Sequence, residues 1–218
     1  GEYAAACVAG LISLDDGLRL TAARGRLTPQ HALEGAMAAV FAPETVVRAV
    51  LASGDGRLSI AAFNGPEHLV LSGPRDAVAA AEARLVAAGV QVKPIRVPHG
   101  AHSQQIDPVL APFRDVLATV RFEAPQIELV SNVTGEVAGL DEAGRVDYWL
   151  QHMRQPVRFA PSMRTLLARG ITHCIEIGPH PVLLGMGAEN VDADASIEWL
   201  PSLRRDRPEG RDLLESLQ

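Results

Sequence analysis

Six structural elements can be predicted from residues 35–98, which read GAMAAVFAPETVVRAVLASGDGRLSIAAFNGPEHLVLSGPRDAVAAAEARLVAAGVQVKPIRVP. Short apolar segments with β-forming residues predict strands, and two longer segments with helical periodicity predict helices. Their order is strand, helix, strand, strand, helix, strand, at 36–41, 43–51, 58–63, 68–71, 74–88 and 90–97. This is the order of a split βαβ, ferredoxin-like unit, so we predict a small βαββαβ subdomain over residues 35–98.

The segments on either side of this unit predict a second, larger α/β subdomain. Residues 1–34 predict two helices, an alanine-rich one to Ser13 and another from Leu14, with Ser13 as the N-cap. Residues 99–200 alternate helical and strand-like patterns. Their predicted elements are helices at 106–117, 146–153 and 160–169, a short helix from 181, and strands at 127–132, 172–177 and 196–200. We therefore expect residues 1–34 and 99–200 to form one α/β subdomain that residues 35–98 interrupt. Residues 201–218 are charged and are expected to be a linker with one weak helix at 209–217.

Composition excludes several classes of function. The chain has 218 residues, 47% of them hydrophobic, which is enough for one substantial core and a small subdomain. A net charge of −6 without a cluster of basic residues argues against a nucleic-acid partner. Cys7 and Cys174 lack the spacing of a metal site, so we expect neither a disulfide framework nor a bound metal. No apolar run approaches the ~18 residues of a membrane span, so we expect a cytoplasmic catalyst with no membrane partner.

Two parts of the sequence carry candidate chemistry. The first is Val97-Pro98-His99-Gly100-Ala101-His102-Ser103, in which His102 is a candidate general base, although histidines also cap turns at the ends of strands. The second is Arg24, whose guanidinium could bind a carboxylate through two parallel hydrogen bonds. An exposed helical arginine is the alternative for Arg24, and it is what we expect for Arg26. From the residues alone, both alternatives stay open.

The first residues match the end of a nucleophile elbow. In Gly-x-Ser-x-Gly, a strand turns sharply into a helix and exposes the serine. Gly1 would be the last glycine of this motif, followed by the small, helix-forming residues Ala4, Ala5 and Ala6. We therefore expect the nucleophilic serine two residues before Gly1.

Eight short motifs, in order along nearly the whole chain, resemble the acyltransferase domain of modular type I polyketide synthases, a relative of malonyl-CoA:acyl carrier protein transacylases. They are Gly1-Glu2-Tyr3, the Ala-Arg-Gly segment at Arg24, Asn64-Gly65-Pro66, His99 to His102, Ser131 to Gly135, Pro156 to Phe159, Glu176 to Pro181, and Leu200 to Arg205. The resemblance implies a larger α/β-hydrolase-like subdomain with a small ferredoxin-like insert.

The resemblance also implies roles for individual residues. His102 would be the catalytic base, oriented by a backbone carbonyl that we assign to His152, and Arg24 would bind the substrate carboxylate. The implied substrate contacts are completed by His99, Gly100 and Ala101, which belong to the specificity motif, and by Asn64. No bound cofactor or metal is implied, because acyl-CoA is a substrate and the phosphopantetheine belongs to an acyl carrier protein. Ketosynthase and linker domains would lie in the same polypeptide.

The specificity motif departs from the family patterns. Malonyl-selective members typically read His-Ala-Phe-His and methylmalonyl-selective members Tyr-Ala-Ser-His, whereas this chain reads His99-Gly100-Ala101-His102. His99 favours malonyl-CoA, which we expect as the donor, but Ala101 lacks the bulk that would exclude an α-methyl group. Methylmalonyl or another α-carboxyacyl extender therefore stays an alternative. So do a serine esterase and an inactive docking domain with the same fold.

Overall fold

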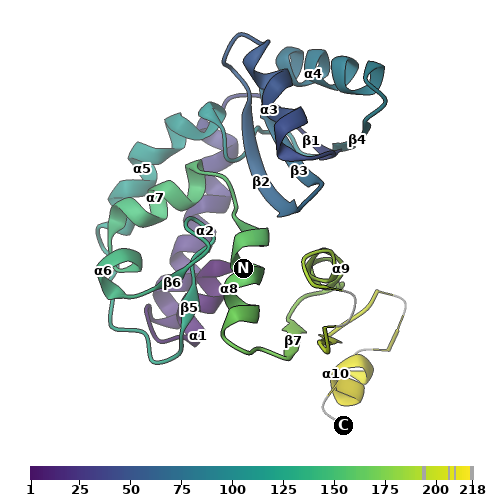
Figure 1. Ribbon diagram of the computed structural model, residues 1–218. Coiled ribbons are helices and arrows are strands. Elements are labelled where there is room, and N and C mark those ends of the chain that lie inside the picture. Colours follow the sequence, from purple (N-terminus) through teal and green to yellow (C-terminus); the bar gives the residue numbers. More distant parts are fainter. Residues whose placement is uncertain (193–194, 206, 209, 217–218) are drawn as a thin grey trace. The chain divides into compact units, whose positions relative to one another are not determined.

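The computed structural model describes residues 1–192, 195–205, 207–208 and 210–216 (Figure 1). They divide into two compact units, residues 1–162 and residues 163–218, which are considered separately below. The first unit contains the predicted four-stranded sheet and a group of helices, and the second contains two strands and two short helices.

The sheet has the predicted ferredoxin-like topology. Its strands are β1 (Ala36–Phe41), β2 (Ser59–Gly65), β3 (His68–Gly73) and β4 (Gln91–Ile95), in the spatial order β2-β3-β1-β4 with every neighbour antiparallel. Helices α3 (Glu44–Ala52) and α4 (Arg75–Ala87) are the two crossovers. The prediction of a βαββαβ unit is confirmed.

Alternation along the strands explains how this sheet is packed. Side chains from one face join α3 and α4 in a single apolar cluster, which includes Val40, Ile60, Leu71, Val47 and Leu85. The opposite face carries a smaller cluster of Ala61, Ala62 and Val70, against which Val157 packs. The first face thus builds the core of the small subdomain, and the second contacts a segment that arrives from the helical part.

The helical part of the first unit surrounds the largest core. It includes α1 (Glu2–Val8), α2 (Leu14–His31), the 3₁₀ turn η1 (Gln104–Ile106), α5 (Asp107–Leu117), α6 (Leu140–Ala143) and α7 (Val146–Arg154). Trp149 and Phe113 are fully buried at its centre, and Trp149 Nε1 donates to the Ala143 carbonyl over 2.9 Å. Ser13 caps α2 as predicted, because its hydroxyl accepts from the Asp16 N–H at 3.1 Å.

Two predicted elements differ markedly from those observed. The predicted helix over residues 1–13 ends at Val8. The predicted strand at 127–132 is only β5 (Leu129–Val130), which pairs with the unpredicted β6 (Val137–Ala138). The turn between them explains its short length, since the Ser131 hydroxyl accepts from the N–H groups of Val133 and Thr134 and reverses the chain.

The second unit pairs β7 (His173–Glu176) and β8 (Glu198–Pro201) in parallel, with α9 (Leu183–Ala188) between them in sequence. Helix α8 (Phe159–Ala168) contains the boundary between the units, and α10 (Arg211–Ser216) lies within the predicted weak helix, whose ends at 209 and 217 fall outside the described residues. No described helix has both the length and the apolar character needed to cross a bilayer.

Candidate active site

The loop with the specificity motif is held where the chain returns from the sheet. Here residues 33–35 leave the helical part beside residues 98–105, and the Leu33 N–H donates to the Gln105 carbonyl at 2.9 Å. The Gln105 amide donates to the Glu34 carbonyl at 2.6 Å, and Glu34 and His99 form an isolated bridge. The two chain segments lie so close together that a Cβ atom at Gly35 would overlap the backbone of Gly100. The loop is therefore fixed from both sides.

His102 lies at the end of this loop with an unusual backbone conformation. Its φ of 58° places it in the left-handed region, which few residues other than glycine adopt. Its ring contacts the Gln155 carbonyl through Nδ1 at 2.8 Å. Because a carbonyl can only accept, Nδ1 must carry the hydrogen, and Nε2 keeps its lone pair.

The protonation state of His102 follows from its surroundings. Burial lowers the pKa of His102 to about 4; the hydrogen bond to the Gln155 carbonyl opposes this shift, and His152 and Arg24 add to it. The imidazole is therefore neutral at physiological pH. A neutral ring with a fixed tautomer can accept a proton at Nε2.

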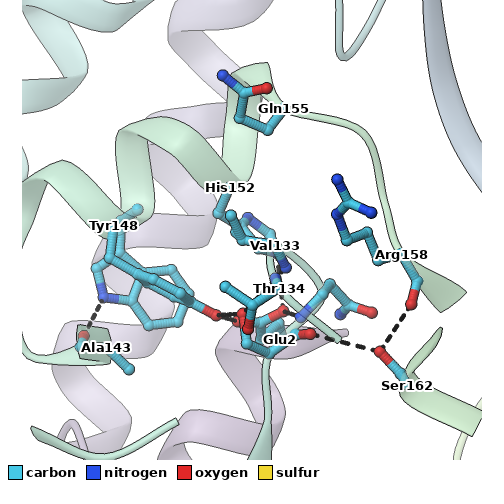
Figure 2. A network of polar contacts seen from close by, with 12 residues as sticks. Glu2, Val133, Thr134, Ala143, Tyr148, His152, Gln155, Arg158 and Ser162 are labelled. Carbon is cyan, nitrogen blue, oxygen red and sulfur yellow. Dashed lines mark hydrogen bonds and ion pairs between the residues drawn. The ribbon is translucent and has the colours of Figure 1, made fainter. Parts of the chain in front are cut away.

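The prediction that the His152 carbonyl orients His102 was wrong by three positions. The carbonyl that contacts the ring belongs to Gln155, the C-cap of α7, and not to His152. One turn earlier on α7, His152 points the other way, and its Nε2 lies 3.3 Å from Oε2 of the buried Glu2 (Figure 2). A C-cap carbonyl has no partner within its own helix, which leaves it available to the ring.

The chain that follows Gln155 attaches to the edge of the sheet. The Val157 N–H donates to the Ala61 carbonyl and the Phe63 N–H donates to the Val157 carbonyl, each at 2.8 Å. A cleft of ≈ 650 Å³ lies along this junction. Its lining includes His102 and Gln155 together with Phe63 of β2 and the arginines Arg48, Arg154 and Arg158. The Arg158 guanidinium lies 5.7 Å from the centre of the Phe63 ring.

Arg24 lies midway along α2 and is partly buried. Within the described part of the chain, its guanidinium makes no hydrogen bond and no ion pair. Its charge reaches the His102 ring, since it is one of the causes that lower the pKa of His102 after burial. Arg26, two residues further along the same helix, is exposed.

Neither Arg24 nor the other predicted substrate contacts are among the residues that line this cleft. Gly100 is buried, and a Cβ atom there would lie 3.0 Å from both Gln105 Cγ and Ser103 Oγ. Its small size therefore serves the packing of the loop. Asn64 is buried near the end of β2, and Ala101 is partly exposed. The buried Nδ1 of His99 has no hydrogen-bond partner among the described residues.

Two important groups near the site were missed by sequence reasoning. Gln155 contributes only a backbone atom, which carries no residue-type signal. Glu2 is a first-turn glutamate, and such residues are common because they complement the helix dipole. As for metals, no group of three or more His, Cys, Asp or Glu side chains among the described residues could hold one.

Comparison with known proteins identifies the family. The family model for the acyl transferase domain matches residues 1–218 of this chain. Mycoketide-CoA synthase of Mycobacterium tuberculosis is 43% identical over 209 residues, which are 96% of this chain and 5% of that protein. The acyltransferase domain from the second module of the salinomycin polyketide synthase has a TM-score of 0.93 and 44% identity, covering 100% of this chain and 51% of the solved one.

A third relative was solved with a partner. A malonyl-transacylase in complex with a type II polyketide synthase acyl-carrier protein has a TM-score of 0.87 and 27% identity. The match covers 100% of this chain and 69% of that one. The larger subdomain is accordingly α/β-hydrolase-like, with the ferredoxin-like unit as its smaller companion. The chain therefore belongs to the acyl transferase domain family, and its relatives are acyltransferase domains of polyketide synthases.

Proposed function

We propose that this chain provides the general base and the carboxylate clamp of an acyltransferase. The enzyme would move an extender acyl group, preferably malonyl, from coenzyme A to the phosphopantetheine thiol of an acyl carrier protein. The observation that carries the proposal is the neutral His102 ring, whose Nδ1–H is held by the Gln155 carbonyl while the charge of Arg24 acts on the same ring.

In the first half-reaction, the attacking group is the serine predicted two residues before Gly1. His102 Nε2 takes the proton of the serine hydroxyl as the serine oxygen attacks the thioester carbonyl. The carbon–sulfur bond then breaks, and the proton passes from His102 to the sulfur of coenzyme A. The products are a serine ester and a free thiol.

In the second half-reaction, the carrier thiol replaces coenzyme A. His102 Nε2 takes the thiol proton, the sulfur attacks the serine ester, and the serine oxygen leaves and regains the proton. The cycle returns His102 to its neutral form, so no cofactor is consumed.

The free carboxylate of an extender unit needs a matched cation inside the site. A guanidinium offers two parallel N–H donors to a carboxylate, and a carboxylate buried without such a partner would be strongly destabilised. Arg24 fits this role because, among the described residues, it has no carboxylate partner of its own. This is what separates an extender-specific transferase from an esterase, which has no use for a partly buried cation.

The arginines of the cleft support the proposal that the substrate carries phosphate groups. Arg48 is paired with Glu44 and Arg154 with Asp107, each at 2.6 Å, whereas Arg158 is held over the Phe63 ring. Coenzyme A and the phosphopantetheine arm both carry phosphate, which guanidinium groups bind well. The relative solved with an acyl-carrier protein supports the same class of partner. Ketosynthase and linker domains in the same polypeptide are part of the proposal.

The test is the loading of acyl groups by the complete acyltransferase domain that contains these residues. In Arg24→Gln, kcat/KM for malonyl-CoA should fall about 100-fold or more, because a charge-assisted, bidentate contact is lost. Acetyl-CoA, which has no free carboxylate, should load at least as well as in the wild type. Loading would be followed by intact-protein mass spectrometry.

Arg26→Gln is the matched control, since it removes an equal charge from the exposed side of the same helix. It should behave like the wild type with both donors. If Arg24→Gln loads malonyl-CoA normally, the clamp is wrong. If the wild type hydrolyses simple esters but loads no acyl-CoA, the chain belongs to a serine esterase.

A further inference from the structure

Glu2 is a buried carboxylate on which three hydrogen-bond donors converge. Its side chain is 1% exposed. Oε1 accepts from the Tyr148 hydroxyl, and Oε2 accepts from the Asn132 N–H at 3.0 Å and faces His152 Nε2 at 3.3 Å (Figure 2). Tyr148 and His152 lie about one turn apart on α7, while Asn132 lies in the turn after β5. One carboxylate therefore joins α1 to α7 and to this turn.

The hydrogens of this network can be assigned. Ser131 Oγ accepts from the Val133 and Thr134 N–H groups, so its own hydrogen is free for the Tyr148 oxygen at 2.8 Å. The single hydrogen of Tyr148 then goes to Glu2. Burial raises the pKa of Glu2, but the hydrogen bonds from His152, Tyr148 and Asn132 outweigh burial and leave this pKa below its usual value. Glu2 is therefore an anion that is held by these three donors.

The link to the active site runs through the last turn of α7. His152 Nε2 is directed at Glu2, and its ring is further held by Tyr3 and Trp149, with centroids 5.6 and 5.5 Å away. Three residues later, the Gln155 N–H donates to the Gln151 carbonyl at 2.6 Å, and the Gln155 carbonyl receives the His102 ring. The side chain that fixes the last turn of α7 thus also fixes the acceptor that orients His102.

We propose that Glu2 is a positioning residue, whose carboxylate holds the end of α7 through His152 so that the Gln155 carbonyl keeps His102 in its reactive tautomer. The inference rests on the proposed function insofar as His102 is the base. Glu2 also lies in the first turn of α1, three residues after the predicted nucleophile. The Glu2 carboxylate would then fix the position of His102 relative to the serine that His102 deprotonates.

The test compares two variants that each disturb one buried hydrogen bond. Glu2→Gln replaces an acceptor oxygen by an amide donor, so one of the three converging donors loses its partner. In the complete domain, kcat for acyl loading should fall about 100-fold, the effect of misplacing a catalytic group by about 1 Å. KM for acyl-CoA should stay unchanged, because no substrate contact is removed.

Tyr148→Phe is the control within the same network. It removes the hydroxyl but keeps the carboxylate and its contact with His152, so stability should fall while kcat stays near the wild-type value. Loss of kcat in Tyr148→Phe equal to that in Glu2→Gln would show general damage and overturn the proposal. So would a wild-type kcat in Glu2→Gln.

A spectroscopic measurement separates this proposal from the proposed function. In ¹⁵N-labelled wild type, two-bond correlations of the His102 ring should report a single tautomer with the hydrogen on Nδ1. Glu2→Gln should show exchange between tautomers, and an unchanged single tautomer would refute the positioning role. This readout needs no turnover, so it still decides the matter if the domain fails to load acyl-CoA and the proposed function falls.

Discussion

His102 has a strained backbone, which directs its ring at one carbonyl, and its imidazole has a low pKa because the ring is buried. The left-handed conformation is about 1–2 kcal/mol less favourable for an L-residue than the right-handed one, and here it directs the ring at the Gln155 carbonyl. That carbonyl fixes the hydrogen on Nδ1 and leaves Nε2 as the only basic atom. The strain is therefore linked to function, because it sets which nitrogen can act.

The low pKa of His102 predicts the acid limb of the pH profile. Its conjugate acid loses a proton at about pH 4, so the base form is already present far below the ordinary value for histidine. For loading by the complete domain, kcat/KM should stay level as the pH falls to about 5 and then decline with an apparent pKa near 4. Circular dichroism at each pH would confirm that the fold persists.

Substrate binding should move this limb. Arg24 contributes to the lowered pKa, and an extender carboxylate would neutralise its charge. The acid limb of kcat should therefore lie at a higher pH than that of kcat/KM. An acid limb of kcat/KM near 6.5 would show that the ring is solvated and not held as described.

Extender choice is predicted to depend on Ala101. Restoring the phenylalanine of the malonyl-type motif with Ala101→Phe should shift the ratio of malonyl to methylmalonyl loading toward malonyl by about 10-fold. This is the effect expected when a pocket loses room for one methyl group, which corresponds to ~1 to 3 kcal/mol.

Competition between the two donors would measure this ratio in a single reaction. Because Ala101 is partly exposed and lies outside the lining of the cleft, an unchanged ratio is the outcome that would exclude it from the pocket. A wild-type preference for methylmalonyl would overturn the choice of malonyl itself.

The packing of α1 on α2 depends on a glycine, Gly17, at the point where the two helices meet. Gly17 lies in the first turns of α2, and a Cβ atom there would overlap Cys7 Sγ of α1. Alanine normally stabilises a helix interior by about 1 kcal/mol relative to glycine. Overpacking of a fitted contact costs typically ~1 to 3 kcal/mol.

Gly17→Ala should consequently lower the free energy of unfolding by about 1 kcal/mol, measured by urea denaturation of the complete domain. In a Cys7→Ala background the sulfur is absent, and the same substitution should raise the free energy of unfolding instead. A stabilising Gly17→Ala in the wild-type background would mean that Cys7 rotates away without cost.

Elements with a strong local pattern were predictable, and contacts between distant segments were not. The four strands of the small sheet and both of its helices follow from periodicity and turn residues, so their bounds differ from the predicted ones by at most two residues. Strand β1 matches its prediction at both ends. Strand β6 has only two residues and is defined by its pairing with β5. No local sequence pattern predicts that pairing.

The candidate site shows the same division. His102 and Arg24 were found because side chains with reactive groups stand in recognisable motifs. The Gln155 carbonyl could not be found, since every residue of that turn offers the same atom and only the course of α7 selects one. Glu2 was visible in its motif, but its three partners lie about 130 to 150 positions away in the chain.

Taken as a whole, the molecule distributes its buried apolar surface unevenly. The first unit contains the large helical core and both faces of the sheet. In the described residues of the second unit, few apolar side chains are buried, and Ile175 and Ile177 are 52% and 81% exposed. Parallel strands are usually covered on both faces, so this unit has little hydrophobic stabilisation of its own.

The two tryptophans offer a probe in each unit. Trp149 is fully buried in the helical core, and Trp199 lies on β8 against Gly187. In the polypeptide of residues 1–218, the fluorescence of Trp199 should change at a lower urea concentration than the fluorescence of Trp149. The reason is that the second unit buries less apolar surface to offset the conformational entropy gained on unfolding. Trp199→Phe isolates the Trp149 signal, and subtracting it from the wild-type curve gives the other. Coincident midpoints for the two signals would show that the units unfold as one cooperative structure, in which case the small core of the second unit does not limit its stability.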